Sequence, residues 1–252
     1  MNDIKENIAS VRQIISETAK KIGKNPQDIR LIAVSKLQPI EKIKLAMDAG
    51  ISYLGENHVQ EFLKKWEILG NAAKWIFIGH LQTNKVKYLT DTISEIQTLD
   101  SLKLSTKLQQ ELQKKNRRLP VLIQINIGEE TTKSGLFPKN LIPFLNEILR
   151  LFEPQNDIFK PQPQNDILEQ SPPRMTYLDI QGLMAIPPYF KDPEKSRPYF
   201  RKMRELLLET QKAFPNLSLR ELSMGMTHDF KIAIEEGATQ VRVGEGIFGK
   251  RR

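Results

Sequence analysis

Residues 30–79 read RLIAVSKLQPIEKIKLAMDAGISYLGENHVQEFLKKWEILGNAAKWIFIG. This stretch contains three short apolar runs, at 30–35, 52–55 and 74–79, and two longer amphipathic stretches between them, at 40–49 and 59–69. Short apolar runs are typical of buried strands, and apolar residues at every third or fourth position are typical of helices. Strands that alternate with helices predict a parallel sheet with right-handed crossovers.

The same alternation continues along the chain. Further strands are expected at 95–99, 121–127, 178–186, 219–224 and 239–243, and further helices at 85–89, 101–115, 139–151, 193–214 and 229–236. Eight strand–helix units in about 250 residues predict an α/β protein with one domain, 1–252, folded as a single closed (β/α)8 TIM-type barrel. The helical spacing of apolar residues in 2–22 predicts a preceding N-terminal helix. Few residues follow the eighth strand, so this helix is expected to fill the eighth outer position.

Residues 153–174 interrupt the alternation. They are rich in Pro, Gln, Asn and Asp, and they contain PQNDI twice, at 154–158 and 163–167. Nothing in the segment can pack into a core, which predicts a flexible insertion in a surface loop. A recognition segment is the alternative. A domain boundary is not expected, because the alternation resumes in phase afterwards.

Composition narrows the class of protein. The chain has 38 Lys and Arg against 30 Asp and Glu, a net charge of +8, with 39% apolar residues and no cysteine. Disulfides, thiolate catalysis and Cys-ligated metals are therefore excluded. The polar N-terminus MNDIKENIAS and the lack of an 18-residue apolar run predict a soluble, cytoplasmic protein with no membrane contact. The basic residues form short separate clusters without interleaved aromatics, so no nucleic-acid partner is expected.

The expected strand exits carry chemically useful side chains. In α/β barrels the reactive residues lie where strands end, and the exits here include Lys36, Asn57, His80 and Arg242. A lysine after a buried strand either extends its ammonium to solvent or, when partly desolvated, attacks an aldehyde to form a Schiff base. From Lys36 alone the first interpretation is favoured.

The last two exits favour the second interpretation. Loops after the seventh and eighth strands of such barrels often bind phosphate. Here they contain hydroxyl groups, glycines and a cation: Ser223, Gly225, Thr227, Arg242 and Gly244. A lysine suited to an aldehyde, opposite a phosphate cradle, indicates pyridoxal 5′-phosphate (PLP) as cofactor.

Several longer motifs carry a resemblance that covers the chain in order. They are AVSK (33–36), GENHVQE (55–61), FIGHLQTNK (77–85), INIGEETTKSGL (125–136), GLMAI (182–186), LSMGMTHDF (222–230) and VRVGEGIFG (241–249). With them the sequence resembles the pyridoxal phosphate homeostasis (PLP-binding) protein family, which shares its barrel with the N-terminal domain of alanine racemase. The resemblance implies the type III PLP fold without its C-terminal β domain.

The resemblance also implies roles for individual residues. Lys36 would carry PLP as a Schiff base, with Asn57 and Met224 near the ring and His80 among the cofactor-binding residues. The phosphate would be surrounded by Ser223, Gly225, Met226, Thr227 and Gly244. Arg242 would lie near the ring nitrogen or near the phosphate, and both positions stay open. The sequence departs from the family at His58, where many relatives carry an aromatic residue, and at Glu245-Gly246.

Two functions are compatible with the expected PLP site. A PLP-dependent amino-acid racemase needs an acid/base group on each face of the cofactor. Only Lys36 is evident, and the chain ends at Arg252 without residues for the racemase's second domain. The expectation is therefore a non-catalytic, monomeric PLP carrier. By resemblance it would serve vitamin B6 homeostasis and amino-acid/keto-acid balance, with PLP-dependent apo-enzymes as further partners.

Two other classes of function are weaker. His58, His80 and His228 all follow expected strands, which suggests a metal-dependent hydrolase, but no paired ligand pattern supports it. A pure interaction module would leave Lys36 and Arg242 unexplained.

Overall fold

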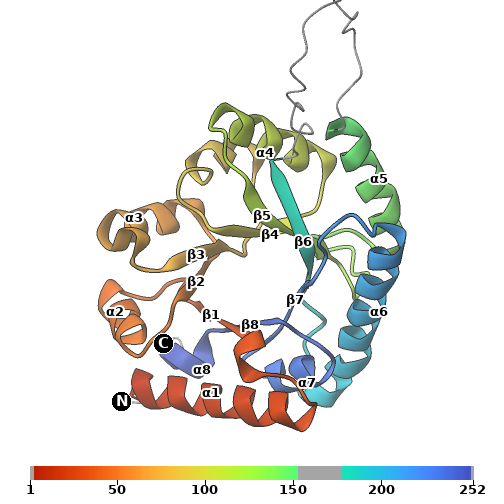
Figure 1. Ribbon diagram of the computed structural model, residues 1–252. Coiled ribbons are helices and arrows are strands. Elements are labelled where there is room, and N and C mark those ends of the chain that lie inside the picture. The colour runs from red at the N-terminus through yellow and green to blue at the C-terminus, as the bar shows by residue number, and fades with distance from the viewer. Residues whose placement is uncertain (1–2, 153–176, 251–252) are drawn as a thin grey trace, which may run out of the picture.

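Eight parallel strands form a closed barrel in the computed structural model, which describes residues 3–152 and 177–250. Each strand pairs with the next along the chain, and β8 pairs with β1 (Figure 1). The strands are β1 (Arg30–Val34), β2 (Tyr53–Glu56), β3 (Lys74–Phe77), β4 (Glu95–Leu99), β5 (Leu119–Ile125), β6 (Leu178–Ala185), β7 (Glu221–Met226) and β8 (Gln240–Val243). The predicted fold is confirmed.

Helices surround the barrel. They are α1 (Ile4–Lys21), α2 (Ile40–Asp48), α3 (Val59–Leu69), α4 (Leu102–Lys114), α5 (Leu141–Phe152), α6 (Arg197–Ala213), α7 (Phe230–Glu235) and α8 (Glu245–Phe248). Helix α1 buries Ile8, Val11 and Ile15 and packs against α2, α7 and the short α8. It therefore takes an outer position beside β8 and β1, as the sequence predicts (Figure 1).

Several expected elements differ from the sequence prediction, among them β5 (Leu119–Ile125), which begins and ends two residues earlier than expected. Between β3 and β4 the chain forms a 3-10 helix, η3 (Thr83–Tyr88), which buries Val86 and lacks the apolar stripe of an α-helix. The helix expected at 193–214 begins as η5 (Pro193–Ser196) before α6. Strand β7 continues to Met226 because that residue pairs with Arg242 of β8. Short 3-10 helices also occur at η1 (Pro26–Asp28), η2 (Gly70–Ala72) and η4 (Pro138–Asn140).

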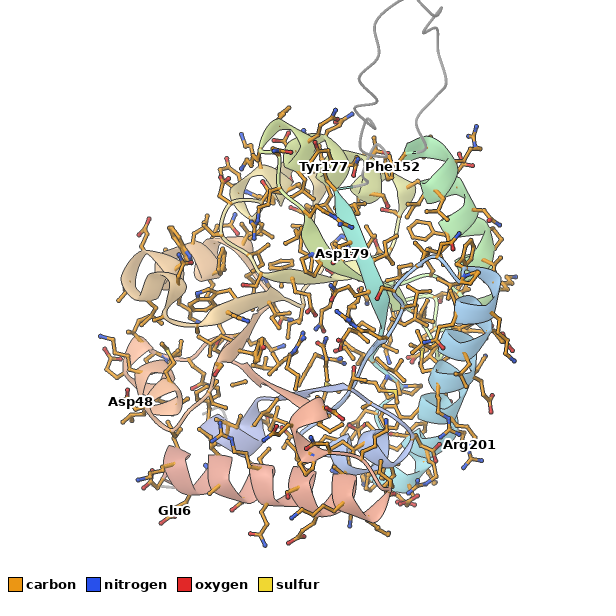
Figure 2. The ribbon with its side chains drawn as sticks, in the orientation of Figure 1. Glu6, Asp48, Phe152, Tyr177, Asp179 and Arg201 are labelled. Carbon is orange, nitrogen blue, oxygen red and sulfur yellow. The ribbon has the colours of Figure 1, made fainter. Side chains whose placement is uncertain are left out.

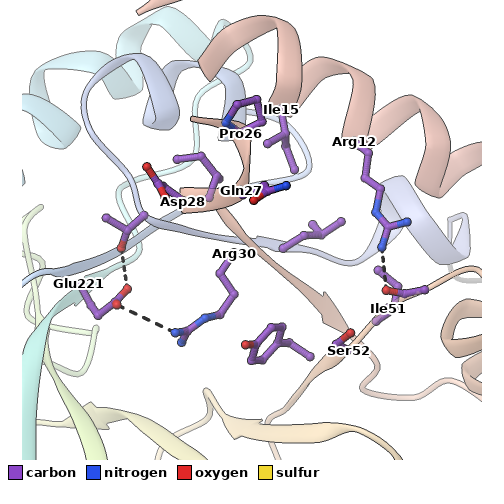
Figure 3. Close-up of a pocket in the computed structure, with 14 residues that line it drawn as sticks. Arg12, Ile15, Pro26, Gln27, Asp28, Arg30, Ile51, Ser52 and Glu221 are labelled. Atoms are coloured by element: carbon purple, nitrogen blue, oxygen red, sulfur yellow. Dashed lines mark hydrogen bonds and ion pairs between the residues drawn. The ribbon is translucent and has the colours of Figure 1, made fainter. Parts of the chain in front are cut away.

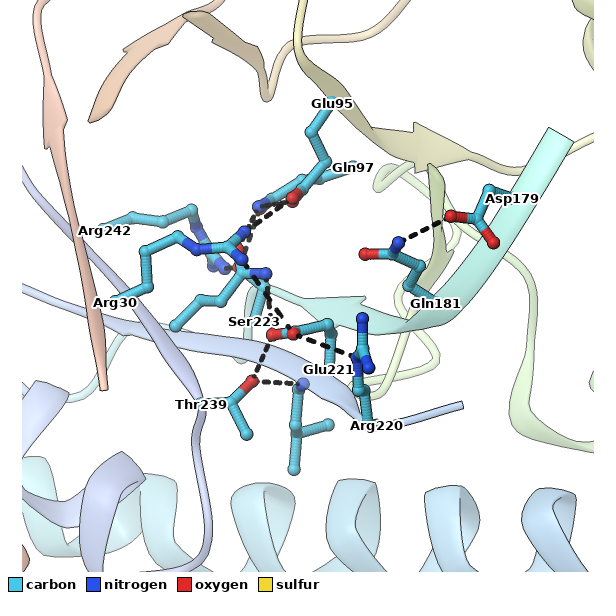
Figure 4. A network of polar contacts seen from close by, with 12 residues as sticks. Arg30, Glu95, Gln97, Asp179, Gln181, Arg220, Glu221, Ser223, Thr239 and Arg242 are labelled. Atoms are coloured by element: carbon cyan, nitrogen blue, oxygen red, sulfur yellow. Dashed lines mark hydrogen bonds and ion pairs between the residues drawn. The ribbon is translucent and has the colours of Figure 1, made fainter. Parts of the chain in front are cut away.

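Side chains fill the barrel interior, and many of them are polar (Figure 2). A chain of hydrogen bonds crosses it from Arg30 to Glu95 (2.7 Å), Gln97 (2.6 Å), Ser223 (2.7 Å) and Arg242 (2.6 Å) (Figure 4). Burial raises the pKa of Glu95, and the charge of Arg30 opposes that rise. Along this chain of hydrogen bonds the polar groups of the packed interior satisfy one another.

The predicted insertion at 153–174 lies outside the residues that the structure describes. Within 3–152 and 177–250, no helix combines the length and the apolar character needed to cross a membrane.

A buried carboxylate connects α6 to the end of α7 and gives a pH-dependent prediction. Glu236 accepts hydrogen bonds from Arg197 (3.1 Å) and Arg201 (3.3 Å). Burial raises the pKa of Glu236, but these two arginines, together with the charge of Arg204 (3.5 Å), outweigh burial, so its pKa lies below the ordinary 4.5. A carboxyl whose pKa is depressed by folding stabilises the protein above its unfolded-state pKa, and this contribution is lost as the pH falls through the folded-state value.

Glu236→Gln is therefore expected to lower the free energy of unfolding by about 1–2 kcal/mol at neutral pH. Urea unfolding should show this difference shrinking as the pH falls below 4.5, where Glu236 itself becomes protonated in the wild type. The exposed Glu205 on α6 provides the control, since Glu205→Gln should change stability by less than about 0.5 kcal/mol. A difference that stays constant with pH would contradict the assigned ion pairs.

Candidate functional site

The predicted site residues gather at one end of the barrel. Because the strands are parallel, their carboxyl ends share one rim. The half-buried Lys36 follows β1, and Asn57 follows β2 directly. His80 lies after β3, and the loops after β7 and β8 complete the rim. The structure thus brings the lysine and both proposed phosphate loops to the same face.

A cavity of about 280 Å³ opens at this end, beside β2, β3 and β5. Its polar lining includes Asn57, His80, Asn126 and Lys133. The buried Oδ1 atom of Asn57 has no hydrogen-bond partner within the described chain, so it offers an acceptor to a ligand donor. Nearby, burial raises the pKa of Asp100, and the charge of His80 opposes that rise.

Lys133 is a charged lining residue that sequence reasoning did not single out. Its Nζ lies 2.6 Å from the carboxylate of Glu130 and 3.4 Å from the carbonyl oxygen of Pro187. Both partners belong to loops that follow strands, and no periodic pattern marks loop residues. The sequence feature that could have indicated Lys133 is its position in the motif INIGEETTKSGL (125–136), which begins at the end of β5.

Arg242 provides the strongest electrostatic feature (Figure 4). Its side chain comes from β8, is 3% exposed, and donates to Ser223 Oγ (2.6 Å) and to the carbonyl oxygen of Ala185 (2.8 Å). Burial lowers the pKa of Arg242 to about 10, and the charge of Asp229 opposes this shift. At neutral pH the guanidinium is therefore charged, yet it forms no ion pair with any carboxylate in 3–152 or 177–250. A buried cation of this kind favours a ligand that brings an acceptor or an anion.

The loops after β7 and β8 are joined to each other. The Gly246 N–H donates to Thr227 Oγ1 (3.2 Å), and the Met226 N–H donates to Asp229 Oδ1 (2.8 Å). Gly244 begins the short helix α8. Met226, Thr227 and Gly244 are only partly buried or exposed, so this backbone is open to a ligand. Glu245, a departure from the family pattern, is exposed.

Ser223 and Met224 lie within β7 rather than in the loop, and Gly225 and Met226 are the last two residues of the same strand. The Ser223 hydroxyl donates to Gln97 Oε1 (2.7 Å) and accepts from Arg242, so it supports the guanidinium instead of facing the loop. Met224 is fully buried in the hydrophobic core, and strand alternation turns it to the face of β7 opposite Ser223. This placement gives no support to the expectations that Ser223 contacts phosphate and that Met224 packs near the ring.

Gly225 lets the end of β7 approach α7, which leads to a prediction. Its φ is +88°, and an added Cβ would lie 2.5 Å from Ala233 Cβ. Gly225→Ala is expected to lower the free energy of unfolding by at least about 3 kcal/mol, from backbone strain and from the clash together. Gly23, with a φ of +71° and open space around it, is the matched control. Gly23→Ala should cost only about 1–2 kcal/mol. Equal losses in thermal or urea unfolding would contradict the close approach.

A second cavity, of about 510 Å³, lies at the opposite end of the barrel (Figure 3). There Arg12 donates to the carbonyl oxygens of Ala49 and Gly50. The Arg30 guanidinium lies 4.9 Å from the Tyr53 ring centre and 4.0 Å from Glu221. These charges are already paired with the protein, and the N-terminal end of such barrels serves stability. The candidate functional site is therefore the carboxyl end of the barrel.

The three histidines do not form a metal site. Nowhere in the described part of the chain do three His, Asp or Glu side chains come together in a group that could hold a metal ion. His228 instead contacts the carbonyl oxygen of Lys191 (3.0 Å), and His58 is exposed before α3. The hydrolase interpretation thus has no ligand set in the structure.

Comparison with known proteins places the chain in a family. The model described as "alanine racemase, N-terminal domain" matches residues 2–156. A protein of Aquifex aeolicus (strain VF5) named pyridoxal phosphate homeostasis protein is 41% identical over 248 residues, which cover 98% of each chain. The chain belongs to the pyridoxal phosphate homeostasis protein family.

Solved structures agree with this family and with the fold. PipY of Synechococcus elongatus PCC7942, solved with PLP bound, is 30% identical with a TM-score of 0.77, over 98% of this chain and 100% of PipY. The alanine racemase of Clostridium difficile 630 has a TM-score of 0.64 at 15% identity, which shows a common fold alone. The match to that racemase covers 100% of this chain and 57% of the racemase, whereas the match to the pyridoxal phosphate homeostasis protein above covers both chains.

Proposed function

We propose that this chain binds PLP at the carboxyl end of the barrel and acts as a PLP carrier in vitamin B6 homeostasis. The observation that carries the proposal is the buried guanidinium of Arg242, which forms no ion pair with a carboxylate in 3–152 or 177–250 and lies at the same end as Lys36 and the two joined loops. The relatives named pyridoxal phosphate homeostasis protein and the PLP complex of PipY support it.

The residues present suit the parts of PLP, which supplies an aldehyde, a pyridine nitrogen and a phosphate. Lys36 would hold the aldehyde carbon as a Schiff base, formed by its Nζ with loss of one water. The backbone and hydroxyl groups of Gly225, Met226, Thr227 and Gly244 would hold the phosphate. Asn57 and His80 line the cavity at this rim and would lie beside the ring.

Arg242 is proposed to face the ring nitrogen rather than the phosphate. Its guanidinium lies within the barrel, against Ser223 of β7 and Ala185 of β6, whereas the residues proposed for the phosphate either end β7 (Gly225, Met226) or follow β7 and β8 (Thr227, Gly244). A guanidinium donates hydrogen bonds and does not give up its proton near pH 7. It would therefore keep the ring nitrogen unprotonated, which makes PLP a weak electron sink.

A titration combined with an assay tests the function. Protein freed of PLP should bind one PLP per chain and develop a saturable visible absorbance band. Incubation with single amino-acid enantiomers should give no racemisation beyond that caused by free PLP. Racemisation that Lys36→Ala abolishes would refute the carrier and support the racemase alternative. Absence of PLP binding would refute the proposal itself.

A carrier function also has implications for where the chain acts and which proteins it meets. We propose that the chain acts in the cytoplasm as a monomer and hands PLP to PLP-dependent apo-enzymes there. Sedimentation should give a mass close to that of one 252-residue chain. Transfer should appear as faster activation of an apo-enzyme by the loaded protein than by an equal amount of free PLP. A stable dimer or unaccelerated activation would contradict these two points.

A further inference from the structure

The backbone on both sides of Lys36 is held by two side chains of helix α3. The carbonyl oxygen of Ser35 accepts a hydrogen bond from Lys65 Nζ at 2.7 Å. The Leu37 N–H donates to Glu61 Oε1. Lys65 and Glu61 are themselves joined at 2.7 Å, one helical turn apart. The residues before and after Lys36 are therefore fixed by one rigid element.

The ammonium of Lys65 has no spare donor. Besides Ser35, it binds Glu61 and Glu56 Oε1, the latter at 2.7 Å. An ammonium has three N–H groups, and these three partners use all of them. Glu56 is 0% exposed and also accepts from Ser35 Oγ (2.6 Å), and Lys65 is 6% exposed. The position of the Lys65 ammonium is thus fixed by three partners at once.

Leu37 shows what this arrangement maintains. Its φ is +60°, in the left-handed region that residues with a Cβ rarely adopt. Its side chain is 68% exposed, so packing does not compensate for the strain. Two hydrogen bonds hold this conformation: the Leu37 N–H donates to Glu61, and the Gln38 N–H closes the turn onto the Ser35 carbonyl oxygen (3.0 Å). Strained backbone maintained by its surroundings is typical of functional sites.

Stability alone does not account for the cluster. A buried ion pair gains little over well-packed apolar side chains of similar volume, because removing two charges from water is costly. Besides Glu56 of β2, the partners of this cluster include the two backbone groups that flank Lys36, the Ser35 carbonyl oxygen and the Leu37 N–H. This arrangement fits a function in positioning.

We propose that Glu61 and Lys65 are positioning residues, which hold residues 35–37 so that the Nζ of Lys36 is presented to the PLP aldehyde. The inference rests on the proposed function, since it concerns how Lys36 meets that aldehyde. Neither residue needs to contact the cofactor.

Glu61→Ala tests the proposal, because it removes the acceptor of Leu37 and leaves Lys65 paired with Glu56. Binding is measured with PLP and with pyridoxine 5′-phosphate, which has an alcohol in place of the aldehyde and cannot form a Schiff base. PLP affinity, followed by the visible band, is expected to fall five- to thirty-fold, or about 1–2 kcal/mol. Affinity for pyridoxine 5′-phosphate should change less than about twofold.

Two further variants complete the experiment. Glu111→Ala removes a similar partner of Lys107 on α4, where the two groups lie 2.8 Å apart, and should alter neither affinity. Leu37→Asn, added to Glu61→Ala, should restore part of the lost PLP affinity, because asparagine tolerates the left-handed conformation.

The outcomes distinguish a positioning role for Glu61 and Lys65 from a purely structural role. A fall in affinity for both compounds would overturn the positioning role in favour of a purely structural one. If the wild type binds PLP and Glu61→Ala binds it with the same affinity, the positioning role is also overturned. A wild type that binds neither compound would refute the proposed function and this inference with it.

Discussion

Lys36→Ala is expected to abolish the visible band that PLP gives with this protein, and to weaken PLP retention at least about 100-fold, or 2.7 kcal/mol. The covalent bond to Nζ is proposed to carry most of the retention, while the phosphate loops and Arg242 contribute non-covalent contacts. Equilibrium dialysis followed by absorbance spectroscopy measures both quantities.

The control for this variant is a lysine on the adjoining helix. Lys64 of α3 is exposed, and Lys64→Ala should keep the band and the wild-type affinity. Both variants should unfold at about the same temperature as the wild type, because neither lysine is fully buried. A band that survives in Lys36→Ala with unchanged affinity would remove Lys36 from the proposed site.

Arg242→Met is expected to weaken PLP binding about 10- to 100-fold while changing the stability of the PLP-free protein by less than about 2 kcal/mol. A hydrogen bond that involves a charged group contributes about 1.5–3 kcal/mol, which sets the loss of affinity. Removing a buried cation is favourable, and this gain offsets the unpaired carbonyl oxygen left at Ala185. Unfolding and binding should therefore respond very differently.

The same variant decides what Arg242 faces. Pyridoxal lacks the phosphate but retains the ring nitrogen. If Arg242 faces the nitrogen, Arg242→Met should weaken PLP and pyridoxal by the same factor. If Arg242 faces the phosphate, the variant should weaken PLP alone, and that result would contradict the proposed orientation. A large loss of stability with unchanged affinity would make Arg242 a structural residue.

The alternation of strands and helices predicted the barrel because each crossover repeats the same periodic signal. Helix α1 was predicted to complete the outer ring on the same basis, and its buried Ile8, Val11 and Ile15 confirm this. The short η3 was harder to predict, since one buried residue gives no period. The end of β7 depends on pairing with β8, a long-range contact that local sequence does not contain.

The site was predicted less completely than the fold. Lys36, Asn57 and His80 follow strands, so topology brings them to one rim. Ser223 was expected at the loop, but β7 extends past it, and its hydroxyl lies beside Arg242. The pair Glu61 and Lys65 has the four-residue spacing of ordinary exposed helix pairs. Only the tertiary structure shows that Lys65 is buried against Ser35 and Glu56.

Reduction with borohydride, followed by peptide mass mapping, tests the central claim most directly. Borohydride converts a Schiff base into a stable amine bond, which marks the lysine that held PLP. One reduced pyridoxyl group per chain is predicted, on the peptide that contains Lys36. A label on another lysine, or no label on protein that has been saturated with PLP, would contradict the claim that Lys36 holds the cofactor.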